Sequence, residues 1–126
     1  AGRVDMIESD AAACLQCRRN LLSRAAADYE VVSGDAAWAL AKLAQRGKKI
    51  DLLFLDPPRD GFAAGMKDII KLAPRTIIYL SCGPSDTARD VKTLCGAGWR
   101  LEELSGFDFF PHTFHIESLS VLRRSI

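Results

Sequence analysis

Three motifs along this chain carry side chains that could perform covalent and acid–base chemistry. A thiol, Cys82, follows an apolar run at residues 76–80 and opens a Ser-Cys-Gly-Pro turn. A carboxylate, Asp56, follows a second apolar run at residues 50–55 and precedes two prolines, and Glu117 comes late in the chain. Because open α/β sheets place their chemistry at the carboxyl ends of the strands, we expect these groups to converge on one cleft.

Along the sequence, short apolar runs alternate with longer segments whose apolar residues have the spacing of a helix. This alternation is typical of an α/β fold with a mostly parallel sheet, which would position these residues. We expect strands at residues 4–8, 29–32, 50–55, 76–80, 99–104 and 118–122. We expect helices after Ser9 or Asp10 and at residues 35–45, 65–72 and 84–95. The third strand is nearly all apolar, so we expect it to be buried on both faces.

The composition is that of one globular domain, with 126 residues, 48% hydrophobic and 26% charged. No apolar stretch approaches the eighteen or so residues that span a bilayer, and the first residues do not have a signal-peptide layout, so we predict a cytoplasmic protein without a membrane partner. The net charge of +1 does not indicate a class of partner. The chain has no glycine-rich strand-to-helix turn of the G-x-G kind, so we expect an incomplete cofactor-binding domain.

Four cysteines in a chain long enough to build a core indicate free thiols rather than a disulfide framework. Cys14 and Cys17 have the spacing of a zinc or redox half-site, but they share a helical face with Leu21 and Ala25. We therefore favour core packing for this pair, and we expect Cys95 to be structural as well.

Taken together, the motifs resemble those of the S-adenosylmethionine-dependent RNA uridine C5-methyltransferases. The resemblance is carried by DPPRDG at residues 56–61, by SCGP at 81–84 with ARD at 88–90, and by FPHTFHIES at 110–118. It covers essentially the whole chain, as the latter part of that family's catalytic domain. It implies a Rossmann-like methyltransferase fold with a carboxyl-terminal antiparallel strand. The first strand, the glycine motif and any RNA-binding or iron–sulfur domain would lie outside residues 1–126.

The resemblance also assigns roles to the reactive side chains. It implies that Cys82 adds to C6 of a uracil in ribosomal or transfer RNA, and that Glu117 removes the C5 proton after methyl transfer from S-adenosyl-L-methionine. Asp56 and Pro57 would shape the pocket for the base and the cofactor. Independently of the resemblance, the helix that follows Cys82 points its first N–H groups at the thiol and favours the thiolate.

Two further carboxylates are candidates for the cofactor side. Glu8 ends a predicted strand, where an acidic residue can accept hydrogen bonds from ribose hydroxyls. Asp35 resembles the family position that contacts the adenine, and Asp56 also belongs to this cofactor-binding set. For Arg89 and Asp90 we expect an ion pair on a helix face rather than contacts to RNA.

Other functions stay open at this point. An N-methyltransferase of the same fold would use the loop at Asp56, although Arg59 stands where such enzymes place an aromatic residue. A cysteine hydrolase would pair Cys82 with His112 or His115, but nothing in the sequence indicates an oxyanion hole. The two histidines lack a third ligand, so we expect no metal site. The chain could also be a folded but inactive piece.

The resemblance predicts a specific defect in the sheet. In the family's strand order, 3-2-1-4-5-7-6, the absent first strand would lie between the strand at residues 4–8 and the strand at 50–55. Its absence leaves about 9–10 Å, two strand spacings, lined by unpaired backbone groups. We therefore expect these two strands to close up, or another chain to pair with them.

Overall fold

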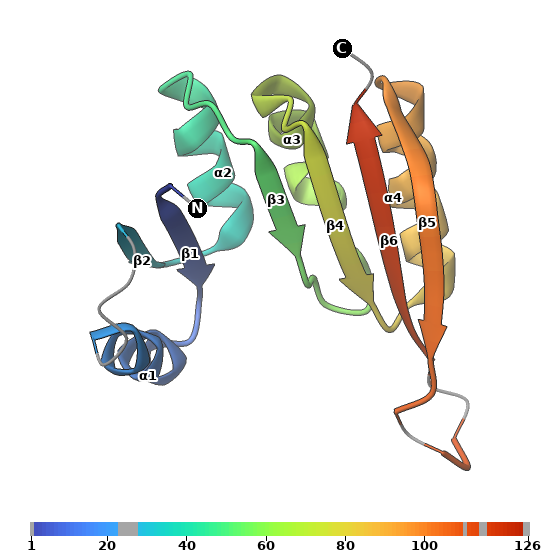
Figure 1. Cartoon of the computed structure of the whole chain (residues 1–126), viewed down its shortest axis with the longest axis horizontal. Coiled ribbons are helices and arrows are strands. Elements are labelled where there is room, and N and C mark those ends of the chain that lie inside the picture. Colours follow the sequence, from blue (N-terminus) through green and yellow to red (C-terminus); the bar gives the residue numbers. More distant parts are fainter. Residues whose placement is uncertain (1, 23–27, 110, 114–115, 125–126) are drawn as a thin grey trace.

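The computed structural model describes residues 2–22, 28–109, 111–113 and 116–124. It confirms an α/β fold in which strands and helices follow one another as the sequence predicts (Figure 1). The strands are β1 (Val4–Glu8), β2 (Tyr29–Ser33), β3 (Leu52–Leu55), β4 (Thr76–Ser81), β5 (Trp99–Phe107) and β6 (Glu117–Arg124). The helices are α1 (Ala11–Leu22), α2 (Ala36–Gln45), α3 (Met66–Leu72), preceded by the 3₁₀ turn η1 (Ala63–Gly65), and α4 (Pro84–Gly96).

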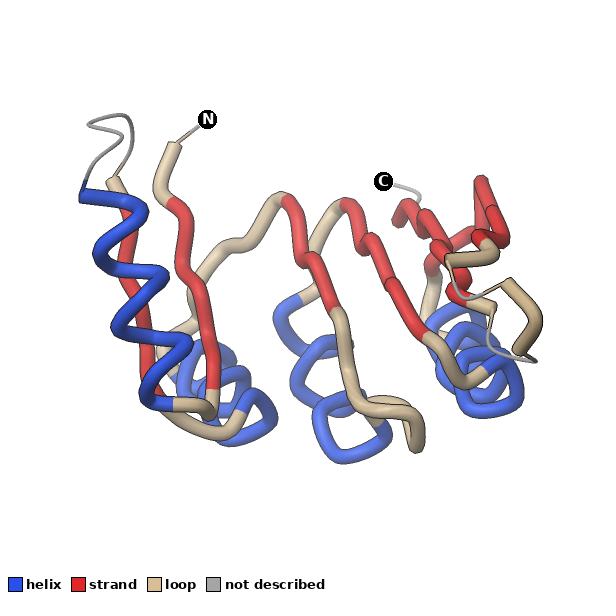
Figure 2. Tube along the Cα trace, turned by 90° about the horizontal axis from the view of Figure 1, so that it is seen from below, coloured by secondary structure: helices blue, strands red, loops and turns tan. Residues whose placement is uncertain are grey.

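The strands form two separate sheets. In one, β1 pairs with β2 in parallel; in the other, the order is β3-β4-β6-β5. β3 and β4 are parallel, and β6 runs antiparallel to both of its neighbours. Figure 2 shows α2, α3 and α4 along one face of the strands, with α1 on the other side of β1 and β2. The predicted antiparallel strand near the carboxyl end is β6, but the strands are divided between a parallel sheet and a mixed sheet rather than joined in one mostly parallel sheet.

The expectation that β1 and β3 close up is wrong, because no ladder joins these two strands. The physical reason is α2, which contacts both β1 and α3 and therefore spans the two sheets. An ion pair between Asp5 of β1 and Lys48, after α2, also bridges the sheets. Pairing with another chain stays a prediction.

The hydrophobic core lies between the four-stranded sheet and helices α2, α3 and α4. Its fully buried members include Ile69, Ile77 and Leu122. The other face of β3 is open: Leu52 is 54% exposed and Phe54 is 57% exposed. The expectation that β3 is buried on both faces is therefore wrong, because in the part of the chain that the structure describes helices cover only one of its faces.

The first helix confirms the packing interpretation of the cysteine pair. Asp10 begins α1, since its Oδ1 accepts a hydrogen bond of 2.6 Å from the backbone N–H of Ala13. Cys14 is buried, and the Sγ of Cys17 lies 3.2 Å from the sulfur of Met6. Ala25, predicted on the same face, lies outside the described residues.

The predictions for the remaining cysteines have mixed outcomes. All four cysteines are free, as predicted. Cys95, however, is exposed near the end of α4, so the prediction that it packs in the core is wrong. Among the helices that the structure describes, none is both long and apolar enough to cross a bilayer.

Candidate active site

The pairing of β4 with β6 brings Cys82 and Glu117 together. The antiparallel ladder between these strands ends with the pair Ser81 and Ser118, and the Ser118 hydroxyl donates a 3.1 Å hydrogen bond to the Ser81 carbonyl. Cys82 directly follows Ser81, and Glu117 directly precedes Ser118. Cys82 and Glu117 therefore both adjoin the last pair of the β4–β6 ladder.

The alternation of side chains along β6 shows which face Glu117 occupies. Ser120 and Leu122 are buried on the face that the helices cover. Successive residues of a strand point to opposite faces. Glu117 is three residues from Ser120 and five from Leu122, so its side chain points to the opposite face, away from α4. Its carboxylate is half-buried and stands on the open side of the sheet.

The loop after β3 reaches the same edge and touches the cysteine turn. Leu55 pairs with Tyr79 at the end of the β3–β4 ladder. Asp56 therefore follows the end of β3 close to Leu80, which lies two residues before Cys82. Further along the loop, the carbonyl oxygen of Arg59 approaches Gly83 so closely that an added Cβ on Gly83 would lie 2.3 Å from it. The two motifs are in direct backbone contact, and this contact requires glycine at position 83.

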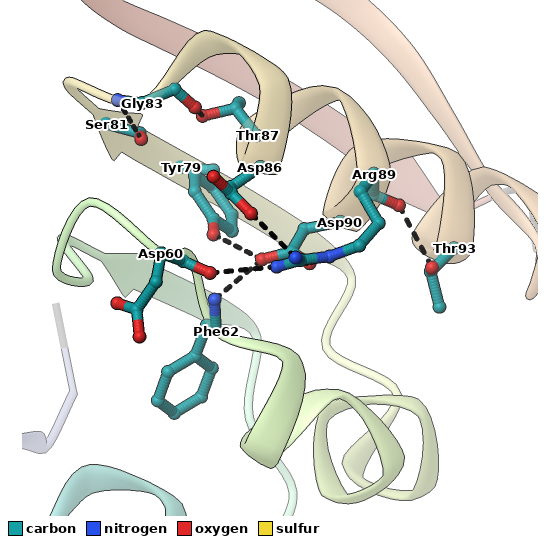
Figure 3. Close-up of polar contacts among 10 residues, drawn as sticks. All are labelled: Asp60, Phe62, Tyr79, Ser81, Gly83, Asp86, Thr87, Arg89, Asp90 and Thr93. Carbon is teal, nitrogen blue, oxygen red and sulfur yellow. Dashed lines mark hydrogen bonds and ion pairs between the residues drawn. The ribbon is translucent and has the colours of Figure 1, made fainter.

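A buried carboxylate, Asp90, hydrogen-bonds to both the loop after β3 and strand β4 (Figure 3). Its side chain comes from α4 and is 1% exposed. Its Oδ2 accepts two hydrogen bonds, 2.6 Å from the backbone N–H of Phe62 and 2.7 Å from the Tyr79 hydroxyl. Burial, and then the hydrogen bond to Asp90, raise the pKa of Tyr79 well above its usual value near 10. Asp90 thus ties the loop after β3 to both β4 and α4.

Arg89 extends the same cluster to the surface. Its guanidinium lies 3.0 Å from Asp90 Oδ1 and 2.6 Å from Asp86, and it donates a 2.9 Å hydrogen bond to the Asp60 carbonyl. The hydrogen bond to Asp90 raises the pKa of Arg89. The expected ion pair on the helix face is confirmed. Gly61 packs against the side chains of Arg89 and Asp90. Its φ is 78°, and a Cβ at this position would lie 2.6 Å from Asp90 Oδ2.

Sequence reasoning missed the role of Asp90 and Tyr79 in holding the loop. A signal for it was present: Tyr79 carries a polar group inside an apolar run, and a buried tyrosine hydroxyl usually has a hydrogen-bond partner. The sequence does not say which residue that partner is, because Asp90 lies eleven residues away on another element.

The two predicted cofactor carboxylates lie at the same edge, but on the other sheet. Glu8 ends β1, and its carbonyl accepts a 2.9 Å hydrogen bond from the N–H of Gly34, directly before Asp35. Asp35 begins α2, where its Oδ1 accepts a 2.8 Å hydrogen bond from the N–H of Trp38. Both side chains are exposed, so each presents carboxylate oxygen to an approaching ligand. The carboxyl ends of β1, β2, β3 and β4 all lie at one edge (Figure 1).

Two histidines, His112 and His115, belong to the segment between β5 and β6. Among the described residues, no three His, Cys, Asp or Glu side chains form a group that could hold a metal ion. His112 is exposed with a φ of 69°, and His115 lies outside the described residues. A cysteine–histidine pair is therefore not observed in this part of the chain.

Comparison with known proteins identifies the class to which this fold and site belong. Residues 38–125 match the profile of the family described as tRNA (Uracil-5-)-methyltransferase. The chain belongs to this family.

Individual relatives agree with this assignment. The chain is 37% identical over 123 residues to 23S rRNA (uracil(1939)-C(5))-methyltransferase RlmD of Aliivibrio fischeri, covering 95% of this chain and 26% of the relative. It is 35% identical over 119 residues to an uncharacterized RNA methyltransferase of Caldanaerobacter subterraneus, covering 94% and 26%. The chain thus spans about a quarter of the length of these curated relatives.

Solved structures show the same fold. The tRNA (uracil-54, C5)-methyltransferase of Pyrococcus abyssi, in complex with S-adenosyl-L-homocysteine, superposes with a TM-score of 0.71 at 28% identity, over 96% of this chain and 34% of that one. A precorrin-6y C5,15-methyltransferase of Geobacter metallireducens superposes with a TM-score of 0.65 at 17% identity, over 98% and 68%, which is a likeness of fold. The Rossmann-like methyltransferase fold predicted from the motifs is confirmed.

Proposed function

We propose that the polypeptide carrying this chain transfers a methyl group from S-adenosyl-L-methionine to C5 of a uridine in ribosomal or transfer RNA, with Cys82 as the nucleophile and Glu117 as the base. The observation that supports the proposal is the β4–β6 register, whose last pair, Ser81 and Ser118, adjoins Cys82 on one strand and Glu117 on the other. Membership of the uracil-5-methyltransferase family supports the same reaction. In this reading residues 1–126 form part of the catalytic domain.

The chemistry explains why a thiol and a carboxylate are needed together. Uracil C5 is a weak nucleophile, and addition of the Cys82 thiolate to C6 gives C5 the electron density of an enolate. After C5 is methylated, Glu117 accepts the C5 proton. The electron pair of that C–H bond reforms the C5–C6 double bond, and the bond between C6 and sulfur breaks, which regenerates Cys82 as the thiolate.

The residues present fit the methyl donor that the Pyrococcus abyssi relative's bound product indicates. Glu8 and Asp35 present exposed carboxylates at the ends of adjacent parallel strands, which suits hydrogen bonds from ribose hydroxyls and an adenine amine. When bound, S-adenosyl-L-methionine supplies an electrophilic methyl group. Asp56 would orient the polar edge of the uracil, and the contact of its loop with the cysteine turn, through Arg59 and Gly83, supports this role.

The covalent step is tested by incubating the complete polypeptide with the methyl donor and RNA that contains 5-fluorouridine. The fluorine cannot leave as a cation, so a Cys82 adduct should accumulate and survive denaturing electrophoresis. Cys82→Ala should abolish both the adduct and methylation, whereas Cys95→Ala, which removes an exposed cysteine on α4, should change neither. Normal methylation by Cys82→Ala would refute the proposal.

The role of Glu117 is tested with ordinary uridine RNA. Glu117→Gln keeps the shape of the side chain but cannot accept the C5 proton at a useful rate. We expect a methylated covalent intermediate to accumulate, with turnover reduced by about 10²–10⁴-fold, the usual contribution of a positioned base. Full turnover by this variant would show that another group removes the proton.

A further inference from the structure

Two phenylalanines form an exposed aromatic stack at the carboxyl end of β5. The ring centroids of Phe107 and Phe109 lie 5.5 Å apart, and the ring planes are inclined by only 5°. Phe107 is 38% exposed and Phe109 is 62% exposed. Apolar surface left in water does not stabilise the fold, and exposed apolar side chains that cluster together are candidates for a binding surface.

The stack adjoins the candidate active site. In the β5–β6 ladder Phe107 pairs directly with Glu117, and directly opposed residues of neighbouring strands lie on the same face of a sheet. That face is the open one, away from α4. The end of β5, the start of β6 and the end of β4 with its cysteine turn lie at one edge of the sheet (Figure 1).

We infer that Phe109, supported by Phe107, is a stacking platform for an unpaired nucleobase that flanks the target uridine in the RNA. This inference rests on the proposed function and extends it to substrate binding. Proteins recognise single-stranded RNA by stacking splayed bases on aromatic side chains. The contact of Phe109 with Phe107 fixes its ring before RNA binds, which lowers the ordering cost of binding.

The chemistry of the surface favours stacking over charge. Asp108 lies between the two phenylalanines and is exposed, so its negative charge repels phosphates. A flat aromatic ring accepts any base, because every base has a π-face. The platform therefore contributes affinity and orientation without reading the identity of the flanking base.

The test uses three substitutions at Phe109 in the complete polypeptide. Phe109→Ala should raise the Kd and the KM for RNA by about 5- to 20-fold, the lower part of the range for loss of one stacked base. Phe109→Trp should retain the affinity, and Phe109→Leu should not, because leucine is apolar but cannot stack. The matched control is Leu104→Ala, which removes a side chain of similar exposure, 64% against 62% for Phe109, from the helix-facing side of β5.

Two further readouts separate stacking from a structural role. The dependence of RNA affinity on salt should be the same in Phe109→Ala as in the wild type, because no phosphate contact is lost. A 2-aminopurine placed next to the target uridine should be quenched by the wild type and not by Phe109→Ala. The unfolding midpoint and the KM for the methyl donor should be unchanged.

Three results would overturn the inference while the wild type methylates RNA: unchanged RNA affinity in Phe109→Ala, equal rescue by leucine and tryptophan, or a lowered unfolding midpoint with normal RNA binding. The last two would show that the surface packs against protein. If the wild type itself forms no adduct and methylates no RNA, the proposed function fails and this inference fails with it.

Discussion

Replacing Asp90 by alanine should detach the loop after β3 from the sheet edge. The substitution removes the single oxygen, Oδ2, that accepts hydrogen bonds from the Phe62 N–H and the Tyr79 hydroxyl. Both donors are buried, and Tyr79 is fully enclosed by the core. Neither has access to water as a replacement partner unless the loop moves.

The magnitude follows from these two donors. A buried donor left without an acceptor costs about 1–3 kcal/mol, so the pair would cost about 2–6 kcal/mol. Arg89 is half-exposed and its ion pair with Asp90 contributes about 1 kcal/mol or less. Removing the buried carboxylate also removes the cost of burying its charge. We therefore expect Asp90→Ala to lower the free energy of unfolding by about 3 kcal/mol.

Asp90→Asn is the matched control. An amide oxygen at the Oδ2 position keeps both buried hydrogen bonds, while the NH₂ group replaces the oxygen that faces Arg89. Neutral hydrogen bonds are weaker than charge-assisted ones, so a loss of about 1 kcal/mol is expected. Urea unfolding measures the global effect, and hydrogen exchange of the Phe62 amide measures the local one.

The reasoning is refuted if the alanine and asparagine variants are equally stable, to within about 0.5 kcal/mol, a difference well below the cost of one unsatisfied donor. It is also refuted if the Phe62 amide exchanges no faster in Asp90→Ala than in the wild type. If the loop stays in place in Asp90→Ala, the 5-fluorouridine adduct should form at the normal rate. If the loop detaches, adduct formation should be slower than in the wild type.

The remaining predictions concern the contact between the two motifs and the pH dependence of stability. Gly83→Ala places a methyl group against the Arg59 carbonyl, so it should destabilise the chain by about 1–3 kcal/mol and slow adduct formation; an unchanged adduct rate would show that the loops need not touch. Because the pKa of Tyr79 is raised in the folded state, its stabilising contribution is complete below the unfolded value of about 10 and is lost as pH rises above it. Tyr79→Phe should therefore weaken the fall in urea midpoint between about pH 9 and pH 11; an identical fall in both proteins would contradict the raised pKa.

Much of the site was predictable from the sequence because its residues follow the ends of apolar runs. Asp56 and Cys82 stand at the ends of parallel strands, and parallel strands end at one edge, so their proximity needs no tertiary detail. The position of Glu117 was different: it starts the strand that runs antiparallel to β4. The motif resemblance implied its role, and the register shows that its strand ends the ladder next to the residue before Cys82.

The features that sequence reasoning missed depend on what lies across the molecule from a residue. β3 has the all-apolar pattern of a strand buried on both faces, yet helices cover only one face of it in the described residues. In the same way, an exposed cysteine such as Cys95 and a buried one such as Cys14 have the same local signal. Burial is a property of the packed layers, and periodicity specifies only which residues share a face.

The division into two sheets has a consequence for how the site works. Cys82, Asp56 and Glu117 all belong to the four-stranded sheet or to the loops at its edge, and the supporting Asp90 lies on α4, which packs against that sheet. Glu8 and Asp35 belong to the edge of the other sheet, and no strand pairing joins the two. If those carboxylates hold the methyl donor, the distance from donor to nucleophile is set by α2 and by the Asp5–Lys48 ion pair rather than by a continuous hydrogen-bonded sheet. In the proposed mechanism, addition of Cys82 to C6 would therefore depend on the four-stranded sheet alone, whereas methyl transfer would also depend on the spacing between the two sheets.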